Sequence, residues 1–155
     1  MKREVLVCDH QSTVPVPPAW LVALEEAGVK AAEEIENAHL CGGNPPLVAL
    51  EEIDVALVDD PESDRVHRDF MGIEGATDVI TFEHGEIVIG VEVAKRQAAE
   101  YGEPELRELL RYLVHGLLHL AGHEDEAEET RATMEKIQES LVIKLWAGVE
   151  QRAGS

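Results

Sequence analysis

The chain has 155 residues, a length that suits one domain with a hydrophobic core of its own. Hydrophobic residues make up 45% and charged residues 29%, which is typical of a globular protein and excludes a disordered or fibrous one. The 32 acidic and 13 basic residues give a net charge of −19, which disfavours binding to nucleic-acid backbones unless a local basic rim or a protein partner assists. No apolar run is long enough for a signal peptide or a membrane span, so we expect a cytoplasmic protein that does not engage membranes.

Alternating strands and helices are predicted for the first half of the chain. Strands are indicated by apolar residues that alternate with polar ones, and helices by apolar residues at a spacing of three or four. The expected order is a strand over 4–9, a helix from 17 to about 35, a strand over 50–58 and a helix from 60 to about 70. Asp60 is the predicted N-cap of the last helix, with Pro61 at its first position.

A hairpin followed by three helices is predicted for the second half. The expected elements are strands over 79–82 and 86–89, helices over 91–100, 104–120 and about 127–147, and a frayed tail from 151. The helix over 104–120 is apolar almost all round, which indicates a central, buried position. Cys8 and Cys41 form no CxxC pattern, so we expect two thiols that are buried or incidental.

The buried helix and the turn after it carry the most chemically distinctive stretch of the chain. His115 and His119 stand four positions apart, so on a helix both imidazoles lie on one face, where one cation can bind both. Gly122 can end the helix, and Asp125 follows ten positions after His115. Two His, one Asp and an open position form a ligand set suited to a catalytic zinc. We predict one Zn²⁺ ion bound by these three side chains, with His123 as the alternative third ligand.

Gly116 occupies the position directly after the first histidine. Zinc peptidases of the HExxH type place a glutamate there as general base, so a peptidase is disfavoured. Taken with the predicted elements, the motif indicates an α+β fold: a small mixed sheet of about four strands, with helices packed around a buried metal-bearing helix. We expect a single domain over residues 1–155.

Three motifs carry a resemblance to a known family. The run from His115 to Asp125 resembles the His-Gly-x-Leu-His-Leu-x-Gly-x-Asp-His signature of the YbeY endoribonucleases, the bacterial ribosomal-RNA maturation factors. Gly75–Phe82 is similar to that family's Pro-Thr-Asp-Val-Leu-Ser-Phe stretch, and Gly85–Ile89 to its Gly-Asp-Ile-Val-Ile stretch. The motifs occur in the family's order and spacing, so the resemblance covers roughly residues 54–126. It implies that His115 and His119 are zinc ligands and that Asp125 stands at the position of a third histidine.

One departure from the family pattern concerns a basic residue. The family has an arginine before a glycine in a Phe/Tyr-Arg-Gly stretch, and this chain has Met71 there, before Gly72. If that arginine holds the scissile phosphate, as the family pattern implies, the role passes to Arg68 or Arg65, or RNA cleavage is lost. Either arginine can equally be part of a solvated helix face.

The remaining polar residues near the motifs leave alternatives open. Thr77 and Asp78 either turn toward the metal or cap a turn. Glu124 and Glu86 are candidates for a proton carrier, and we take Glu124, with Arg68, as the catalytic candidates. A basic rim around the cleft, or simply exposed helix charges, would be formed by Lys95, Arg96, Arg107 and Arg111.

We therefore expect a zinc-dependent endoribonuclease of ribosomal RNA maturation, hydrolysing a phosphodiester by metal-activated water. Its partners would be ribosomal RNA or a ribosomal subunit, with a ribosomal protein as a further candidate. The missing arginine and the charge of −19 favour an alternative, a ribosome-assembly or adaptor protein with a chiefly structural zinc. A metal hydrolase of a non-nucleic substrate is a third hypothesis, because the motif encodes a metal site and no substrate.

Overall fold

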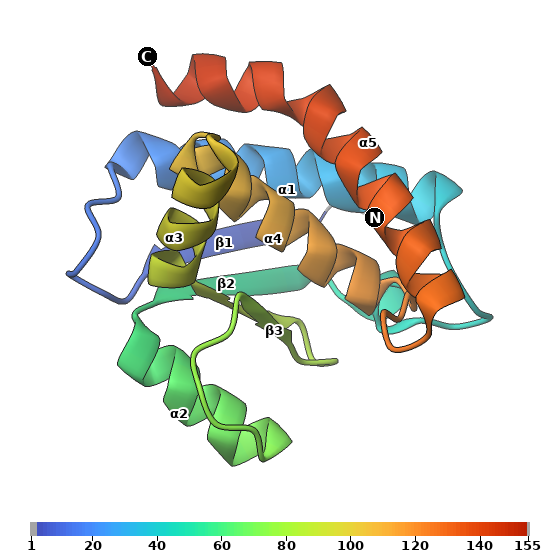
Figure 1. Cartoon of the computed structure of the whole chain (residues 1–155). Helices are drawn as coiled ribbons and strands as arrows, with labels where there is room; N and C mark the ends of the chain where they lie inside the picture. The colour runs from blue at the N-terminus through green and yellow to red at the C-terminus, as the bar shows by residue number, and fades with distance from the viewer. Residues whose placement is uncertain (1–2, 155) are drawn as a thin grey trace.

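The structure, a computed structural model, describes residues 3–154 (Figure 1). Within that range the chain forms β1 (Glu4–Asp9), α1 (Pro18–Ala38), the 3₁₀ turn η1 (Pro46–Ala49), β2 (Glu52–Val58), α2 (Asp60–Met71), β3 (Val79–Thr81), β4 (Glu86–Gly90), α3 (Val91–Tyr101), α4 (Glu105–Leu120) and α5 (Glu128–Ala153). None of these helices has the length and apolar character needed to cross a membrane.

The four described strands form one mixed sheet in the order β1-β2-β4-β3. β1 pairs parallel to β2, and β2 pairs parallel to β4, whereas β3 runs antiparallel to β4. Parallel neighbours need a long crossover, which α1 supplies between β1 and β2 and α2 supplies between β2 and the hairpin. The hairpin closes where Gly85 N–H donates to the Phe82 carbonyl at 2.9 Å. The predicted α+β fold with a four-stranded mixed sheet is confirmed.

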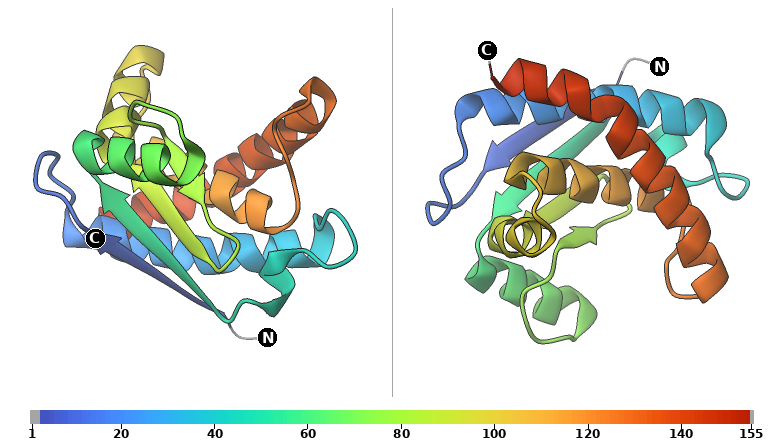
Figure 2. Two further views of the ribbon diagram at one scale, coloured as in Figure 1. Left: turned by 90° about the horizontal axis from the view of Figure 1, so that it is seen from below. Right: turned by 45° about the horizontal axis from the view of Figure 1, so that its top comes forward.

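Helices cover the two faces of the sheet unequally (Figures 1 and 2). α1 and α4 pack on one face, with α5 lying across both of them, and α2 packs on the other. The larger hydrophobic core lies on the first face, where alternate residues of β1 and β2 are buried together with α1 and α4: Val5, Val7, Ile53, Val55 and Leu57. A smaller core on the second face joins α2 to the sheet through Val58, Val66, Ile80 and Val88.

The predicted central helix is α4, and its packing depends on a glycine. Its leucines are almost fully buried between α1, α3, α5 and the sheet. A Cβ on Gly116 would lie 2.9 Å from Ile87 Cγ2, so only a glycine lets α4 approach β4 this closely. This contact brings the histidine-bearing end of α4 against β3 and β4.

A second glycine turns the chain at the end of α4. Gly122 has a φ of +98°, and a Cβ there would lie 2.1 Å from the Cys41 carbonyl oxygen. The loop after α1 packs against this turn, where Cys41 N–H donates to the Ala121 carbonyl at 2.9 Å. The turn therefore redirects the chain so that Asp125 returns toward α4.

Several local predictions differ from the structure. The N-cap of α2 is Asp59 and not Asp60, because the Asp59 carboxylate accepts the Glu62 N–H at 3.0 Å. α5 continues to Ala153, so the predicted frayed tail is helical up to that residue; Ser155 lies outside the described residues. Cys8 and Cys41 are exposed, which removes the buried alternative for both.

Candidate metal centre

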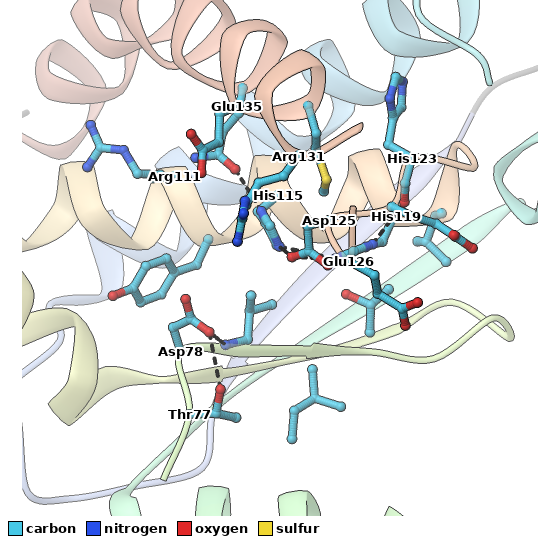
Figure 3. A pocket seen from close by; sticks show the side chains of 18 of the residues that line it. Thr77, Asp78, Arg111, His115, His119, His123, Asp125, Glu126, Arg131 and Glu135 are labelled. Atoms are coloured by element: carbon cyan, nitrogen blue, oxygen red, sulfur yellow. Dashed lines mark hydrogen bonds and ion pairs between the residues drawn. The ribbon is translucent and has the colours of Figure 1, made fainter. Parts of the chain in front are cut away.

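Three side chains from the end of α4 and the turn after it converge (Figure 3). His115 Nε2 and His119 Nε2 lie 3.1 Å apart. Asp125 Oδ2 lies 3.4 Å from His115 Nε2 and 3.6 Å from His119 Nε2. We call these three residues the His–His–Asp cluster; among the described residues it is the one group of histidine, cysteine and carboxylate side chains with metal-site geometry.

The orientation of the His115 ring is fixed by α5. Gln138 Nε2 donates to Glu139 Oε2 at 3.0 Å, so the Gln138 Oε1 atom faces His115. His115 Nδ1 lies 2.7 Å from that oxygen and must therefore be the protonated ring nitrogen. Its Nε2 atom is left with a free lone pair that points into the cluster.

His119 is oriented in the same way by the backbone. Its Nδ1 donates to the His123 carbonyl oxygen at 3.0 Å, which leaves its Nε2 unprotonated. Burial, followed by the neighbouring His115, lowers the pKa of His119 below its ordinary value. The neutral imidazole that a metal requires is therefore the favoured form.

The cluster fits a zinc ion by its donor set and its spacing. When each Nδ1 donates to its partner, the two Nε2 lone pairs face each other across 3.1 Å, an arrangement that a bound cation would stabilise. A tetrahedral zinc with bonds of about 2.0–2.1 Å separates its ligand atoms by about 3.3 Å. The observed separations of 3.1, 3.4 and 3.6 Å bracket that value. Two imidazoles and one carboxylate also leave one coordination position free for a water or a substrate.

His123, the alternative third ligand, lies outside the cluster. Its ring is buried, and Nε2 donates to the His39 carbonyl oxygen at 2.6 Å, so the side chain points away from Asp125 (Figure 3). Its backbone instead supplies the carbonyl that orients His119. Of the two alternatives, the structure brings Asp125 to the histidines.

The cluster lies in a cleft of about 1050 Å³ between the end of α4, α5 and the strand β3. The candidate Glu124 is exposed and lines this cleft next to Asp125. The candidate Arg68 does not line it: its guanidinium pairs with Asp64 at 3.2 Å and lies in a separate shallow hollow with Glu74. The structure thus brings Glu124, and not Arg68, close to the cluster.

The hairpin and the end of α2 form the opposite wall of the cleft. Met71 lines it with its side chain largely exposed, at the position where the resemblance places an arginine. Thr77 and Asp78 also line it, and Asp78 Oδ1 accepts both the Val79 N–H at 2.8 Å and the Thr77 hydroxyl at 3.2 Å. Asp78 therefore lines the cleft with one carboxylate oxygen bonded to its two chain neighbours, and it is not part of the His–His–Asp cluster.

The four residues proposed as a basic rim do not gather around the cleft. Only Arg111 lines it, and this guanidinium is paired with glutamates. Arg96 pairs with Asp60 at 2.8 Å, and Arg107 lies over the Trp146 ring at 5.8 Å. Lys95 is exposed on α3.

Two residues of α5 near the cluster were not predicted. Gln138 holds His115, and Arg131 lines the cleft from the same helix. Gln138 falls on the apolar stripe of α5, four residues after the buried Met134 and three before the buried Leu141. A polar side chain in the middle of a buried stripe needs a partner, and this was the available signal for Gln138.

Comparisons with known proteins give the family. A family model described as endoribonuclease YbeY matches residues 23–145. An endoribonuclease YbeY of Pelotomaculum thermopropionicum is 31% identical over 156 residues, covering 91% of this chain and 96% of that protein. One from Caldanaerobacter subterraneus is 32% identical over 163 residues, with the same two coverages. One from Myxococcus xanthus is 38% identical over 113 residues, which are 62% of this chain but only 38% of that longer protein.

A solved structure shares the fold. The solution structure of TM1509 from Thermotoga maritima superposes with a TM-score of 0.62 at 24% sequence identity, covering 95% of this chain and 92% of that one. This likeness supports the arrangement of the sheet and helices described above. The family follows from the match of the family model over most of the chain and from the relatives of 31% and 32% identity: the chain belongs to the YbeY endoribonuclease family.

Proposed function

We propose that this protein is a zinc-dependent endoribonuclease that acts in ribosomal RNA maturation. The observation that carries the proposal is the His–His–Asp cluster, in which the Nε2 atoms of both imidazoles and a carboxylate oxygen of Asp125 converge in an open cleft. The relatives named endoribonuclease YbeY support the reaction class. We propose that the substrate is ribosomal RNA, free or within a ribosomal subunit, and that the protein works in the cytoplasm.

The residues in and around the cluster would have separate roles in phosphodiester hydrolysis. When bound by His115, His119 and Asp125, Zn²⁺ would supply a Lewis acid and lower the pKa of a water molecule. With two neutral imidazoles and one carboxylate, the site would keep a net charge of about +1, which favours an anionic substrate. Glu124 lines the cleft beside Asp125, and we propose it as the proton carrier. Arg68 faces another hollow, so any contact it makes to RNA would be remote from the cluster.

The experiment is a cleavage assay with the purified, zinc-loaded protein and a structured RNA. We expect cleavage that a chelator abolishes and that zinc restores. His119→Ala should abolish cleavage and zinc binding with the fold retained, as measured by circular dichroism. His10→Ala is the matched control, because His10 is exposed and lies outside the cleft. No cleavage above the metal-free sample would overturn the proposal.

A second candidate is favoured by the charge of the cleft. Its lining carries many carboxylates, and its one rim arginine from our prediction, Arg111, is neutralised by glutamates. Such a cleft suits a ribosome-assembly or adaptor protein with a structural zinc and a ribosomal protein as its partner. Zinc removal separates the candidates, since loss of the fold on chelation indicates a structural metal, whereas a folded but inactive protein indicates a catalytic one.

We also propose that the chain is a single domain over residues 1–155. One hydrophobic cluster draws on β1, β2, β4, α1, α4 and α5, so it joins the two ends of the described chain. A hydrolase of a non-nucleic substrate stays as a third hypothesis, and the same RNA assay tests it. A zinc-loaded, folded protein that leaves RNA intact would favour that hypothesis.

A further inference from the structure

The cleft around the His–His–Asp cluster is rich in acid. Carboxylates line it from the hairpin, α4, the turn after α4 and α5: Asp78, Glu83, Glu108, Glu124, Asp125, Glu126 and Glu135. The lysine and arginine side chains that line it, among the described residues, are Arg111 and Arg131. A phosphodiester entering this cleft would therefore meet a repulsive field unless one of these arginines is available to it.

Arg111 is not available. Its side chain is only 16% exposed and pairs with Glu103 at 2.9 Å and with Glu139 at 2.8 Å, besides a close contact to Glu108. These three carboxylates outnumber its single positive charge. Arg111 therefore joins α4, α5 and the loop before α4, and it offers no free donor to a ligand.

Arg131, unlike Arg111, is neither buried nor paired with a carboxylate of the described residues. It is exposed, and its side chain makes no ion pair or hydrogen bond with any described residue. It stands seven residues before Gln138, so both lie on the same face of α5. Gln138 contacts His115, which means that this face of α5 is turned toward the cluster. In the view of Figure 3 the Arg131 side chain extends from α5 toward the cleft that His115 and Asp125 also line.

We propose that Arg131 binds a non-bridging oxygen of the RNA phosphodiester at the His–His–Asp cluster, an inference that rests on the proposed endoribonuclease function. The guanidinium is always charged and presents donors in a planar fork that matches phosphate oxygens. It approaches from α5, on the side of the cleft opposite Met71 and the hairpin. In this arrangement the substrate phosphate lies between the cluster and Arg131, and the surrounding carboxylates disfavour orientations that bring other phosphates of the backbone close to them.

The test compares two arginines of α5 in the zinc-loaded protein. Arg131→Met removes the proposed contact, and Arg152→Met is the matched control, because Arg152 lies on the same helix, is exposed and pairs with Glu26 at 2.9 Å away from the cleft. Both variants lose one positive charge, so a general change of net charge affects them equally. Steady-state kcat and KM are measured on a labelled RNA oligonucleotide over a series of salt concentrations.

We expect Arg131→Met to lower kcat/KM by about 10- to 100-fold, the loss typical of one charge-assisted hydrogen bond. The slope of log kcat/KM against log salt should become shallower by about 0.7, because one phosphate contact to a single strand is lost. Arg131→Lys should keep the salt slope and recover part of the rate, since it keeps the charge without the fork. Arg152→Met should stay within about twofold of the unaltered protein.

Two outcomes separate the inference from the proposed function. If the unaltered protein cleaves RNA and Arg131→Met cleaves it with the same rate and salt slope, the role of Arg131 is refuted and the endoribonuclease stands. If the unaltered zinc-loaded protein cleaves no RNA, the proposed function fails and the inference fails with it. An equal loss in Arg131→Met and Arg152→Met would also refute a specific contact, because it would show a general effect of charge.

Discussion

At the scale of single residues, Gly116 sets the contact between α4 and the strands β3 and β4. A Cβ there would lie 2.9 and 3.0 Å from two carbons of Ile87 and 3.2 Å from Thr81 Oγ1. Gly116→Ala should therefore lower the free energy of unfolding by about 1–3 kcal/mol, because α4 must move away from β4. It should also weaken zinc binding, since His115 moves with the helix. Denaturant unfolding and a zinc-chelator competition measure the two effects.

The control for this change is Gly148→Ala on α5. Gly148 is exposed within the helix, and a Cβ there meets nothing within 4 Å. The substitution should raise the free energy of unfolding by about 0.5–1 kcal/mol, because alanine loses less backbone entropy than glycine in a helix. Equal stability of Gly116→Ala and the unaltered protein would show that the contact between α4 and β4 can relax.

Thr81 lies at the same contact, 3.2 Å from the position of a Cβ on Gly116, and carries an unsatisfied hydroxyl group. Its hydroxyl oxygen is buried and has no hydrogen-bond partner among the described residues. Thr81→Val removes the unsatisfied group and keeps the shape, so we expect it to raise the free energy of unfolding by about 1 kcal/mol. Thr77→Val, which removes a hydroxyl that donates to Asp78, should have no such effect. A lower thermal midpoint for Thr81→Val would show that the hydroxyl has a partner in solution.

At the scale of elements, α5 supports the metal ligands of α4. The chain of contacts runs from Arg111 through Glu139 and Gln138 to His115. Gln138→Leu removes the acceptor of the His115 Nδ1 proton, and such losses typically cost about 10- to 100-fold in metal affinity. Gln138→Glu keeps an acceptor and should retain most of the affinity. Unchanged zinc affinity in Gln138→Leu, measured against a competing chelator, would contradict this role.

The ion pairs of Arg111 connect α4 to α5, and we call this contact the joint between the two helices. The stability that the joint contributes should depend on pH. Burial alone would raise the pKa of Glu139, but hydrogen bonds from Arg111 and then Gln138 outweigh it and lower the pKa below the ordinary 4.5. A carboxyl with a lowered folded-state pKa stabilises the protein above its unfolded-state pKa, and this contribution is lost as the pH falls through the folded-state value. The stabilisation by this joint is therefore full near neutral pH and fades below about pH 4.5.

Arg111→Met tests the joint directly. It leaves the side chain of Glu108, which is 6% exposed, without its ion pair, and breaking a buried pair in this way costs about 3–5 kcal/mol. Urea unfolding near pH 7 should show that loss, and the difference from the unaltered protein should shrink below about pH 4.5. Arg65→Met is the control, because Arg65 is 52% exposed and its ion pairs on α2 are worth at most about 1 kcal/mol. A loss that does not change with pH would contradict the ionic origin.

At the scale of the whole molecule, the sequence predicts what depends on local spacing. The alternation in β1 and the spacing of His115 and His119 specify a strand and a two-histidine face without reference to the rest of the chain. The side-chain orientation of His123 could not be predicted, because its partner is a carbonyl 84 positions away, at His39. The place of Arg131 likewise depends on how α5 crosses α4. The two histidines of the His–His–Asp cluster follow from local pattern, whereas the choice of Asp125 over His123 and the contacts that orient the histidines follow from tertiary packing.

The net charge of −19 leads to a prediction for the molecule as a whole. Like charges destabilise the compact state, so salt that screens them should raise the thermal midpoint, most steeply up to about 0.1 M, where the screening length falls to about 10 Å. The kcat/KM of RNA cleavage should instead fall as the salt concentration rises, because salt weakens the phosphate contacts on which the proposed site depends. Thermal unfolding and kcat/KM measured over the same salt series test both trends. Stability and activity that rise together with salt would show that the acidic field, more than any phosphate contact, controls access of RNA to the His–His–Asp cluster.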